Sequence, residues 1–375
     1  MDGLRGIAML LVFLVHFSFV WSGLVPTTGL IGLFLRLIDI NASLGTDFFM
    51  LLSGFFAYGT LARRTKSFGE FIRGRLWRLY PLYLILVVMY VVGSLLIPTM
   101  SKLPTGGFHA VVFLLQTLLF LPGFLRIDPI MDNAWTLGFI VWFYPIEAAA
   151  VRLLHASGLW RLGRFAFLAV AAVAWAVFGN ATGHWPSRTA MFWVGMALSE
   201  IVGGVWGGRV KVAALLTAPA LVIMLASFRF RTVLFLSGTN PTAISLPLLE
   251  TALSGAGLFC FVWLAYYGPE WWRRLLSASP FRQLGACSYS FYLTHGFVVK
   301  AFRFGIVPRL GSAAGHAPVF WMSQVAGLAL SVVVAQVVYR YVEAPLSRLG
   351  TQPSSAVAES ARLTTPVGQP GATGH

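Results

Sequence analysis

The chain opens with Met1-Asp-Gly-Leu-Arg5-Gly-Ile-Ala-Met-Leu-Leu-Val-Phe-Leu-Val-His16-Phe, an apolar run of transmembrane length that carries two ionisable side chains. On a helix, Arg5 and His16 would lie only about 20° apart in azimuth and about 16 Å apart in height. An ionisable group in hydrocarbon costs roughly 2.5–3.5 kcal/mol and persists mainly where it faces a bundle interior or an aqueous cavity. Two interpretations follow: a topology arginine with a histidine bonded to a neighbouring helix, or two parts of one functional site.

The composition indicates an all-α, polytopic membrane helix bundle. Hydrophobic residues make up 58% of the 375, charged residues make up 10%, and the mean hydropathy is +0.78. Runs of about 20 apolar residues recur along the chain, as membrane helices require. Ten such runs are expected to span the membrane: 4–24, 44–62, 76–97, 134–154, 163–180, 189–206, 210–227, 246–267, 283–302 and 319–342.

The segment 108–124 is a short apolar run that ends at Leu-Pro-Gly. Basic residues between positions 63 and 78 place the loop after the second run, and with it the N-terminus, in the cytoplasm. The basic loops within 152–164 and 273–282 share that side only if 108–124 does not span. We therefore predict about ten transmembrane helices, both termini cytoplasmic, and 108–124 as a re-entrant or interfacial segment.

The net charge of +15 comes from 27 basic and 12 acidic residues. The basic residues lie between apolar runs, which indicates a topology signal and attraction to the lipid bilayer, with no nucleic acid as partner. The cysteines, Cys260 and Cys287, lie in or near apolar runs and imply no disulfide framework. Residues 1–349 are predicted to form one membrane domain, and 350–375, rich in small and turn-forming residues, a disordered C-terminal tail.

Acidic residues within the predicted spans are rare. Asp47 falls in the first turn of the second run, where the helix dipole favours a carboxylate. Glu343 precedes the helix-stopping Pro345 and opposes the dipole unless a cation pairs with it. Arg340 and Arg5 are the candidate partners.

Two polar patterns accompany these acids. Arg75 and Arg78 share a face at the cytoplasmic mouth of the third run, where they either snorkel to the surface or form a fork for phosphate. Ser288, Tyr292 and His295 form one polar stripe, at i, i+4 and i+7, on an otherwise apolar helix.

Five motifs follow one another along residues 1 to 350: Asp2-Gly-Leu-Arg5-Gly with His16; Gly45-Thr-Asp47-Phe-Phe-Met-Leu-Leu-Ser53-Gly-Phe55; Arg75-Leu-Trp-Arg78-Leu-Tyr-Pro81; Leu284-Gly-Ala-Cys-Ser288-Tyr-Ser-Phe-Tyr292-Leu-Thr-His295; and Tyr339-Arg-Tyr-Val-Glu343-Ala-Pro345. In this order they resemble the acyltransferase-3 family of integral-membrane O-acyltransferases. Each motif is loose by itself, and the five in order are specific.

The chain departs from this family at one position. Where the family has an acid after Trp-Ser-Leu, the stretch Trp135-Thr-Leu-Gly-Phe-Ile140 has isoleucine. Glu147 lies about 20° away in azimuth and about 10 Å further along the helix, beyond Pro145. It either restores the carboxylate from another height or is a packed acid with an unrelated partner.

The resemblance implies transfer of an acyl group, by expectation acetyl, from cytoplasmic acyl-CoA to a hydroxyl of an extracytoplasmic carbohydrate or glycoside. Acyl-CoA is then a co-substrate, and no permanently bound cofactor or metal is expected. His16 would act as general base or become acylated itself, and Asp47 would orient its ring. The implied location is the bacterial inner membrane.

The remaining site residues follow from the same resemblance. Arg75 and Arg78 would bind the acyl donor, and Arg5 would join them or pair with Glu343. The expected lining or supporting residues are Ser53, Trp135, Glu147, Tyr292, His295 and Glu343. For Trp135, Tyr292 and His295, a plain packing role is equally open.

A different class of function also fits the pattern. Buried charges and glycine-rich helices suit a transporter or flippase for a polar substrate. The phosphate-compatible basic pair beside an intramembrane histidine favours acyl transfer. The sequence defines neither the acceptor, the acyl chain length nor the oligomeric state.

Overall fold

The computed structural model describes nine stretches of the chain: residues 2–26, 28–63, 67–98, 101–125, 127–183, 186–202, 216–236, 245–311 and 315–349. The predicted disordered tail, 350–375, lies outside the described residues. Within them the secondary structure is entirely helical, which confirms the predicted all-α class.

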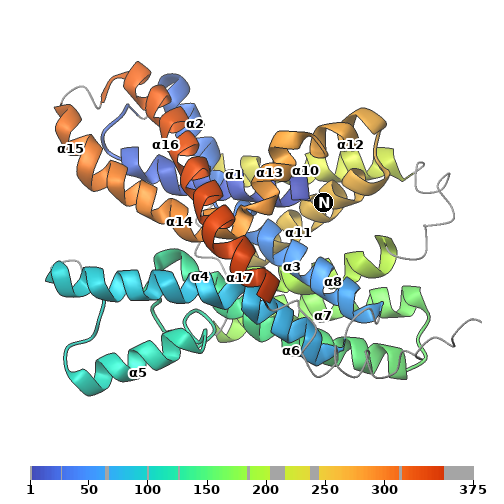
Figure 1. The fold of residues 1–375 in the computed structure, drawn as a ribbon. Helices are drawn as coiled ribbons and strands as arrows, with labels where there is room; N and C mark the ends of the chain where they lie inside the picture. The colour runs from blue at the N-terminus through green and yellow to red at the C-terminus, as the bar shows by residue number, and fades with distance from the viewer. Residues whose placement is uncertain are drawn as a thin grey trace, which may run out of the picture.

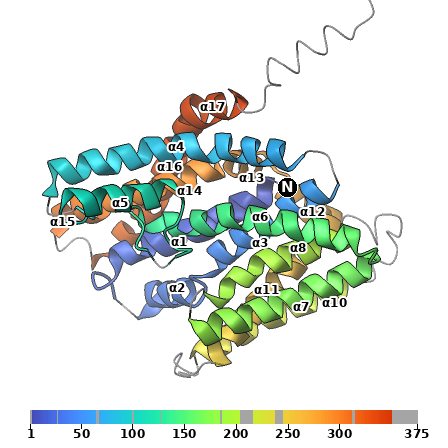
Figure 2. The ribbon, with the colours of Figure 1, turned by 90° about the horizontal axis from the view of Figure 1, so that it is seen from below.

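Most of the long helices run lengthwise in the view of Figure 2, whereas Figure 1 shows α14 and α16 inclined to α4. The longer ones are α1 (Asp2–Ser18), α2 (Gly29–Ile40), α3 (Leu44–Ala62), α4 (Phe68–Leu96), α5 (Gly107–Leu118), α6 (Trp135–Ala156), α7 (Arg161–Thr182), α8 (Met191–Glu200), α10 (Thr217–Leu236), α11 (Ser245–Tyr267), α14 (Ser288–Lys300) and α16 (Ala317–Val338).

Shorter elements connect or end these helices. They are the 3₁₀ turns η1 (Phe19–Trp21), η3 (Asp132–Ala134) and η4 (Ser187–Ala190), the helices α12 (Glu270–Leu276), α13 (Ser279–Ala286), α15 (Val307–Leu310) and α17 (Ala344–Leu349), and the π-helical turns η6 (Ala301–Ile306) and η8 (Tyr339–Glu343).

Seven of the described helical stretches are long and apolar enough to cross a membrane: Asp2–Trp21, Gly29–Ala62, Phe68–Leu96, Asp132–Ala156, Arg161–Thr182, Pro247–Tyr267 and Ala317–Leu349. The predicted spans 189–206 and 210–227 fall partly outside the described residues. The predicted span 283–302 is divided at Cys287 between α13 and α14. The protein is therefore a polytopic helix bundle whose ninth predicted span is built from two helices.

The division at Cys287 has a packing reason. α13 crosses the first turn of α1 so closely that a Cβ on Gly285 would lie 1.8 Å from the Asp2 carbonyl oxygen. Small residues at such crossings let two backbones approach. The short helix α13 thereby fixes the start of α1, and α14 leaves at a new angle to run beside the rest of α1.

The segment predicted to be re-entrant or interfacial forms α5, a helix of 12 residues. At 1.5 Å per residue this is about 18 Å, too short for a hydrocarbon core of about 30 Å. The Tyr83 hydroxyl of α4 donates to the Thr117 carbonyl at 3.1 Å, and both views place α5 beside the C-terminal half of α4 (Figures 1 and 2). α5 therefore lies against α4 without forming a span of its own.

One helix was not predicted. α2 occupies part of the connection between the first and second spans and exposes Leu30, Leu33 and Leu37. An apolar outer face of this kind is typical of a helix that lies in or against lipid. The sequence analysis missed α2 because its 12 residues are too few for a span.

Candidate functional site

α1 presents Arg5 and His16 at its two ends. It is one unbroken α-helix from Asp2 to Ser18, so the predicted spacing of about 16 Å along one face applies to it. We call the end of the bundle where α1 begins the N-terminal end, and the other the opposite end. Each of the two residues belongs to a separate group of polar side chains.

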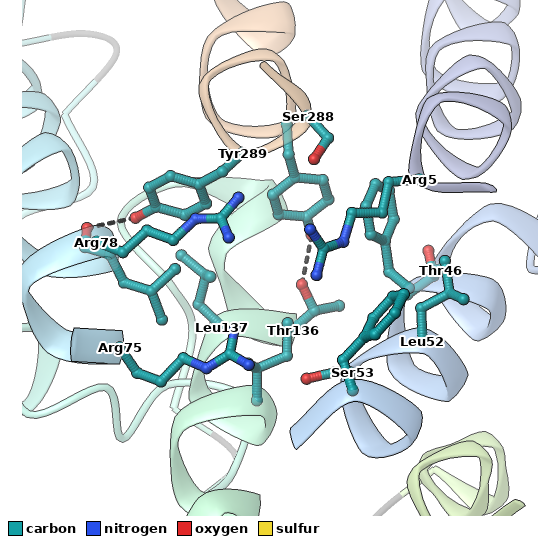
Figure 3. Close-up of a pocket in the computed structure, with 15 residues that line it drawn as sticks. Arg5, Thr46, Leu52, Ser53, Arg75, Arg78, Thr136, Leu137, Ser288 and Tyr289 are labelled. Atoms are coloured by element: carbon teal, nitrogen blue, oxygen red, sulfur yellow. Dashed lines mark hydrogen bonds between the residues drawn. The ribbon is translucent and has the colours of Figure 1, made fainter. Parts of the chain in front are cut away.

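Near the N-terminal end, α1, α3, α4, α6 and α14 enclose a cavity of about 110 Å³. We call it the arginine pocket, because Arg5, Arg75 and Arg78 all line it. Figure 3 shows Arg75 and Arg78 reaching in from one side and Arg5 from the other. Its other described lining residues are Thr46, Phe49, Leu52, Ser53, Phe56, Leu79, Thr136, Leu137, Ile140, Ser288, Tyr289 and Tyr292.

The three guanidinium groups have few counter-charges. Arg5 lies 3.8 Å from a half-exposed Asp2 carboxylate and stacks over the Phe56 ring at 4.6 Å. Arg75 stacks over the Phe71 ring at 5.1 Å and makes no ion pair with any described residue. A pocket lined by a surplus of half-buried cations favours an anionic ligand.

Arg78 is the member of the pocket with a buried carboxylate partner. Its Nε lies 3.6 Å from Glu343 Oε1, and the other oxygen of Glu343 accepts from the Ser290 amide at 3.1 Å and the Ser290 hydroxyl at 2.6 Å. Glu343 therefore forms its ion pair with Arg78. The two predicted partners, Arg5 and Arg340, do not pair with it in the described structure. The contact ties α4, α14 and the turn η8 together and fixes the direction of Arg78.

Asp47 lies on a different side of α3 from the arginine pocket. Its neighbour Thr46 lines that pocket, whereas Asp47 lines a separate polar cavity of about 350 Å³ on another face of α3. There Asp47 Oδ1 accepts from Arg188 Nε at 2.9 Å, and the side chain is 2% exposed. The expected contact between Asp47 and the His16 ring is not among the contacts of His16 in the described part of the chain.

The ring that lies against His16 belongs to His295 of α14. The two ring centroids are 5.1 Å apart at an interplanar angle of 72°. His16 is exposed, whereas His295 is 1% exposed. We call these two residues the histidine pair.

Tyr292 lies at the boundary between the arginine pocket and the histidine pair. It lines the pocket, and its ring is 6.1 Å from that of His295 and 5.7 Å from that of Phe49. Its hydroxyl donates to the Asn133 carbonyl and lies 2.5 Å from Thr136 Oγ1. Neither histidine is among the described lining residues of the pocket, so the two groups are separate in this conformation.

Three further predicted residues take different positions. Ser53 lines the arginine pocket, as does Ile140 at the place of the family's acid. Trp135 packs edge-on against Phe139 at 5.9 Å and is not a described lining residue. Glu147 is fully buried, and neither of its carboxylate oxygens has a hydrogen-bond partner among the described residues.

Sequence reasoning missed four of these contacts. It paired Asp47 with His16 instead of Arg188, and it named no partner for the Tyr292 hydroxyl. It did not foresee the contact of Ser290 with Glu343 or that of His295 with His16. Arg188 offered one signal, as an arginine beside a predicted span on the side where basic residues are not favoured. The others depend on how helices pack, which spacing along one helix does not reveal.

The fold and site define a class: an integral-membrane helix bundle with a cationic pocket near one end and an imidazole pair further along the same central helix. The family model described as "Acyltransferase domain" matches residues 1–340. The chain belongs to this acyltransferase family, which confirms the resemblance drawn from its motifs, and it is an enzyme that transfers acyl groups.

A curated relative points the same way. The chain is 29% identical over 326 residues to the "Exopolysaccharide production protein ExoZ" of Rhizobium meliloti (strain 1021), a match that covers 82% of this chain and 90% of the relative. No solved structure matches the chain.

Proposed function

We propose that this protein transfers an acyl group, by expectation acetyl, from cytoplasmic acyl-CoA to a hydroxyl of a carbohydrate or glycoside on the other side of the membrane. The observation that carries the proposal is the pairing of two groups on one helix. A pocket with an unpaired guanidinium lies near the N-terminal end, and an exposed imidazole lies about 16 Å further along α1.

The acyl donor would bind at the arginine pocket. Coenzyme A carries phosphate groups, and guanidinium forks bind phosphate through paired hydrogen bonds. Arg75 makes no ion pair with a described residue, although the buried Glu147 carboxylate attracts it from a distance. Arg78 is held in place by Glu343. A cavity of about 110 Å³ accommodates only part of the donor, so the bulk of the nucleotide would lie outside it.

His16 would act as the general base. Its Nε2 takes the proton of the acceptor hydroxyl while that oxygen attacks the thioester carbonyl. The carbon–sulfur bond then breaks, and the coenzyme A thiolate leaves with the proton that His16 returns. The products are an O-acyl ester and free coenzyme A with its thiol protonated.

Tyr292 would form a barrier between the two ends of the bundle, as a transfer across the membrane requires. Donor and acceptor would approach from opposite ends of the bundle, and the aromatic pair Phe49 and Tyr292 lies where the two approaches meet. The thioester could reach His16 only after Tyr292 turns aside. Such a barrier would also keep the membrane sealed between reactions.

The relative ExoZ supports the proposed acceptor, and the distribution of basic loops supports the proposed location. ExoZ is named for exopolysaccharide production, which supports a carbohydrate acceptor for this chain as well. The basic loops support cytoplasmic termini and a bacterial inner membrane.

Two measurements test the proposal. Mass spectrometry of surface glycans from cells with and without the gene should show the loss of one acyl unit, 42 Da per site if the group is acetyl (roughly the mass of an added C₂H₂O). In detergent, the purified protein should move label from acetyl-CoA to oligosaccharide prepared from the host's own polysaccharide and freed of esters by mild base. A transporter would leave the label on coenzyme A.

A further inference from the structure

The group that lies against the exposed histidine is a second, buried histidine. A carboxylate beside a histidine base is a common arrangement in enzymes, but the carboxylate predicted for this place, Asp47, is paired with Arg188 at 2.9 Å. His295 lies instead with its ring centroid 5.1 Å from that of His16. Among the described residues, the polar side chain that lies against His16 is therefore an imidazole.

Backbone contacts define which nitrogen of each ring carries the hydrogen. His16 Nδ1 lies 2.9 Å from the Val12 carbonyl oxygen, and His295 Nδ1 lies 3.1 Å from that of Phe291. A carbonyl oxygen only accepts, so each Nδ1 is the donor. In a neutral ring Nε2 then carries the lone pair, and both histidines have the same tautomer.

The Nε2 atom of His295 is buried and has no hydrogen-bond partner among the described residues. A buried acceptor without a partner costs free energy, so its presence calls for an explanation. The His295 ring is also held in one orientation, because it stacks on Phe291 with centroids 5.7 Å apart and an interplanar angle of 7°. Tyr292 covers another side at 6.1 Å. His295 is therefore a rigid, polar neighbour of His16 with one unused lone pair.

We propose that His295 is a positioning residue, which orients the ring of His16 by edge-to-face contact and, through the unpaired lone pair of its own neutral ring, favours the imidazolium that forms on His16 during the transfer, without a hydrogen bond between the two rings. This inference rests on the proposed function. No additional proton moves: His16 takes the proton of the acceptor hydroxyl and passes it to the departing thiolate, while His295 stays neutral throughout. His295 does the work that a carboxylate does elsewhere, without a fixed negative charge in the hydrocarbon.

The test compares two substitutions of one residue. His295→Phe keeps a flat ring against Phe291 but removes the lone pair, and His295→Gln supplies a carboxamide oxygen as a replacement acceptor. The control is His155→Phe, because His155 Nδ1 makes the same contact with a carbonyl four residues back, at 2.8 Å, and lies on α6 away from the histidine pair. Each purified variant is assayed for transfer from labelled acetyl-CoA to the ester-free oligosaccharide, and for an unaltered elution volume in detergent.

We expect kcat of His295→Phe to fall about 10-fold, the lower end of the range for removing a polar partner of a charged group, because the two rings share no hydrogen bond. The KM for acetyl-CoA should stay within about twofold, because the arginine pocket is untouched. The decrease in log kcat should be at most two thirds as large in His295→Gln as in His295→Phe. The kcat of His155→Phe should equal that of the unaltered enzyme.

Three results would overturn the inference: a kcat of His295→Phe close to that of the unaltered enzyme, equal losses in the Phe and Gln variants, or a loss confined to KM. Each of these leaves acyl transfer by the unaltered enzyme in place. Absence of transfer by the unaltered enzyme would instead refute the proposed function, so the two failures are distinguishable.

Discussion

The two ends of α1 differ in how their polar side chains are balanced. The arginine pocket holds three cations, and among the described residues Arg78 is the one that makes an ion pair with a buried carboxylate. The histidine pair carries no fixed charge, and its rings are held by backbone carbonyls of their own helices. Surplus positive charge suits the binding of an anion, whereas an imidazole with a free nitrogen suits the movement of a proton.

The two groups are expected to serve different steps, binding of the acyl donor and transfer of the acyl group. A change at the arginine pocket should alter how tightly the donor binds, and a change at the histidine pair should alter how fast the acyl group moves. Tyr292, between the two, should alter the separation of the two ends of the bundle. The predictions below test these differences.

The largest effect is expected at His16. His16→Ala removes the general base, and kcat should fall about 10²- to 10⁴-fold, the usual range for such a group. Since His16 lies about 16 Å from Arg5 along the helix, the KM for acetyl-CoA should change little. Steady-state transfer of label to the ester-free oligosaccharide measures both constants, and an active His16→Ala enzyme would remove the histidine pair from the chemistry.

The next effect is expected at Arg75. Arg75→Ala removes a guanidinium that makes no ion pair with a described residue, so the KM for acetyl-CoA should rise about 10- to 100-fold with little change in kcat. Arg73→Ala is the matched control, because Arg73 lies on the same helix but is exposed and is not a described lining residue of the pocket. An equal KM in the two variants would argue against donor binding at this pocket.

Arg78→Ala is a poorer choice for this purpose. It would leave the Glu343 carboxylate, which is 3% exposed, without its cation. Breaking a buried pair in this way typically costs about 3–5 kcal/mol of stability, and a loss of activity would then have two causes.

A smaller effect is expected at the barrier. Tyr292→Phe removes the hydroxyl contacts with Asn133 and Thr136, so the ring should turn aside more often. The parent chain for this measurement has Cys260 and Cys287 replaced by alanine and carries one thiol, placed in the pocket by Ser53→Cys. A membrane-impermeant maleimide is added from the opposite end of the bundle. With Tyr292→Phe the thiol should react about fivefold faster than in the parent chain, as expected for losing a hydrogen bond of about 1 kcal/mol.

Tyr289→Phe is the control for that measurement. Tyr289 also lines the pocket and also donates its hydroxyl to a backbone carbonyl, that of Leu79, but it does not contact Asn133 or Thr136 in the described structure. Its labelling rate should equal that of the parent chain. Equal rates in all three chains would show that Tyr292 is not the barrier.

The smallest effect is expected at Glu147, and it has the opposite sign. Glu147→Gln replaces a buried carboxyl, which makes no hydrogen bond with a described residue and has Arg75 as a distant electrostatic neighbour, by a neutral amide of the same shape. Because burying an unpaired charge is costly, thermal unfolding in detergent should show a gain of about 1 kcal/mol, with transfer within about twofold of the unaltered enzyme. Glu343→Gln should lower stability instead, and a large loss of transfer in Glu147→Gln would mean that Glu147 replaces the missing acid.

The arginine pocket was largely predictable from the sequence. Arg75 and Arg78 are three residues apart on one helix, and Arg5 is near the start of another, so their shared height in the bundle follows from the order of the spans. The membrane character and the short segment at 108–124 were equally visible, because apolar length alone defines them.

The partners of the acids and of the histidine were not predictable. Thr46 and Asp47 are adjacent in sequence, yet they line different cavities because the helix turns by about 100° per residue. Glu343 reaches Arg78 through a π-helical turn, and His295 reaches His16 because α14 begins anew after Cys287. These features depend on helix crossings that close glycine contacts define, and no pattern within one segment specifies them.

A sided assay tests most directly whether the two ends of α1 work together across the membrane. Proteoliposomes of known orientation would hold the ester-free oligosaccharide on one side and labelled acetyl-CoA on the other. We expect label on the oligosaccharide only when acetyl-CoA is on the side of Arg75 and Arg78, and none with His16→Ala. Transfer of equal extent in both arrangements, or only when both substrates share one side, would contradict a donor site and an acceptor site at opposite ends of the bundle.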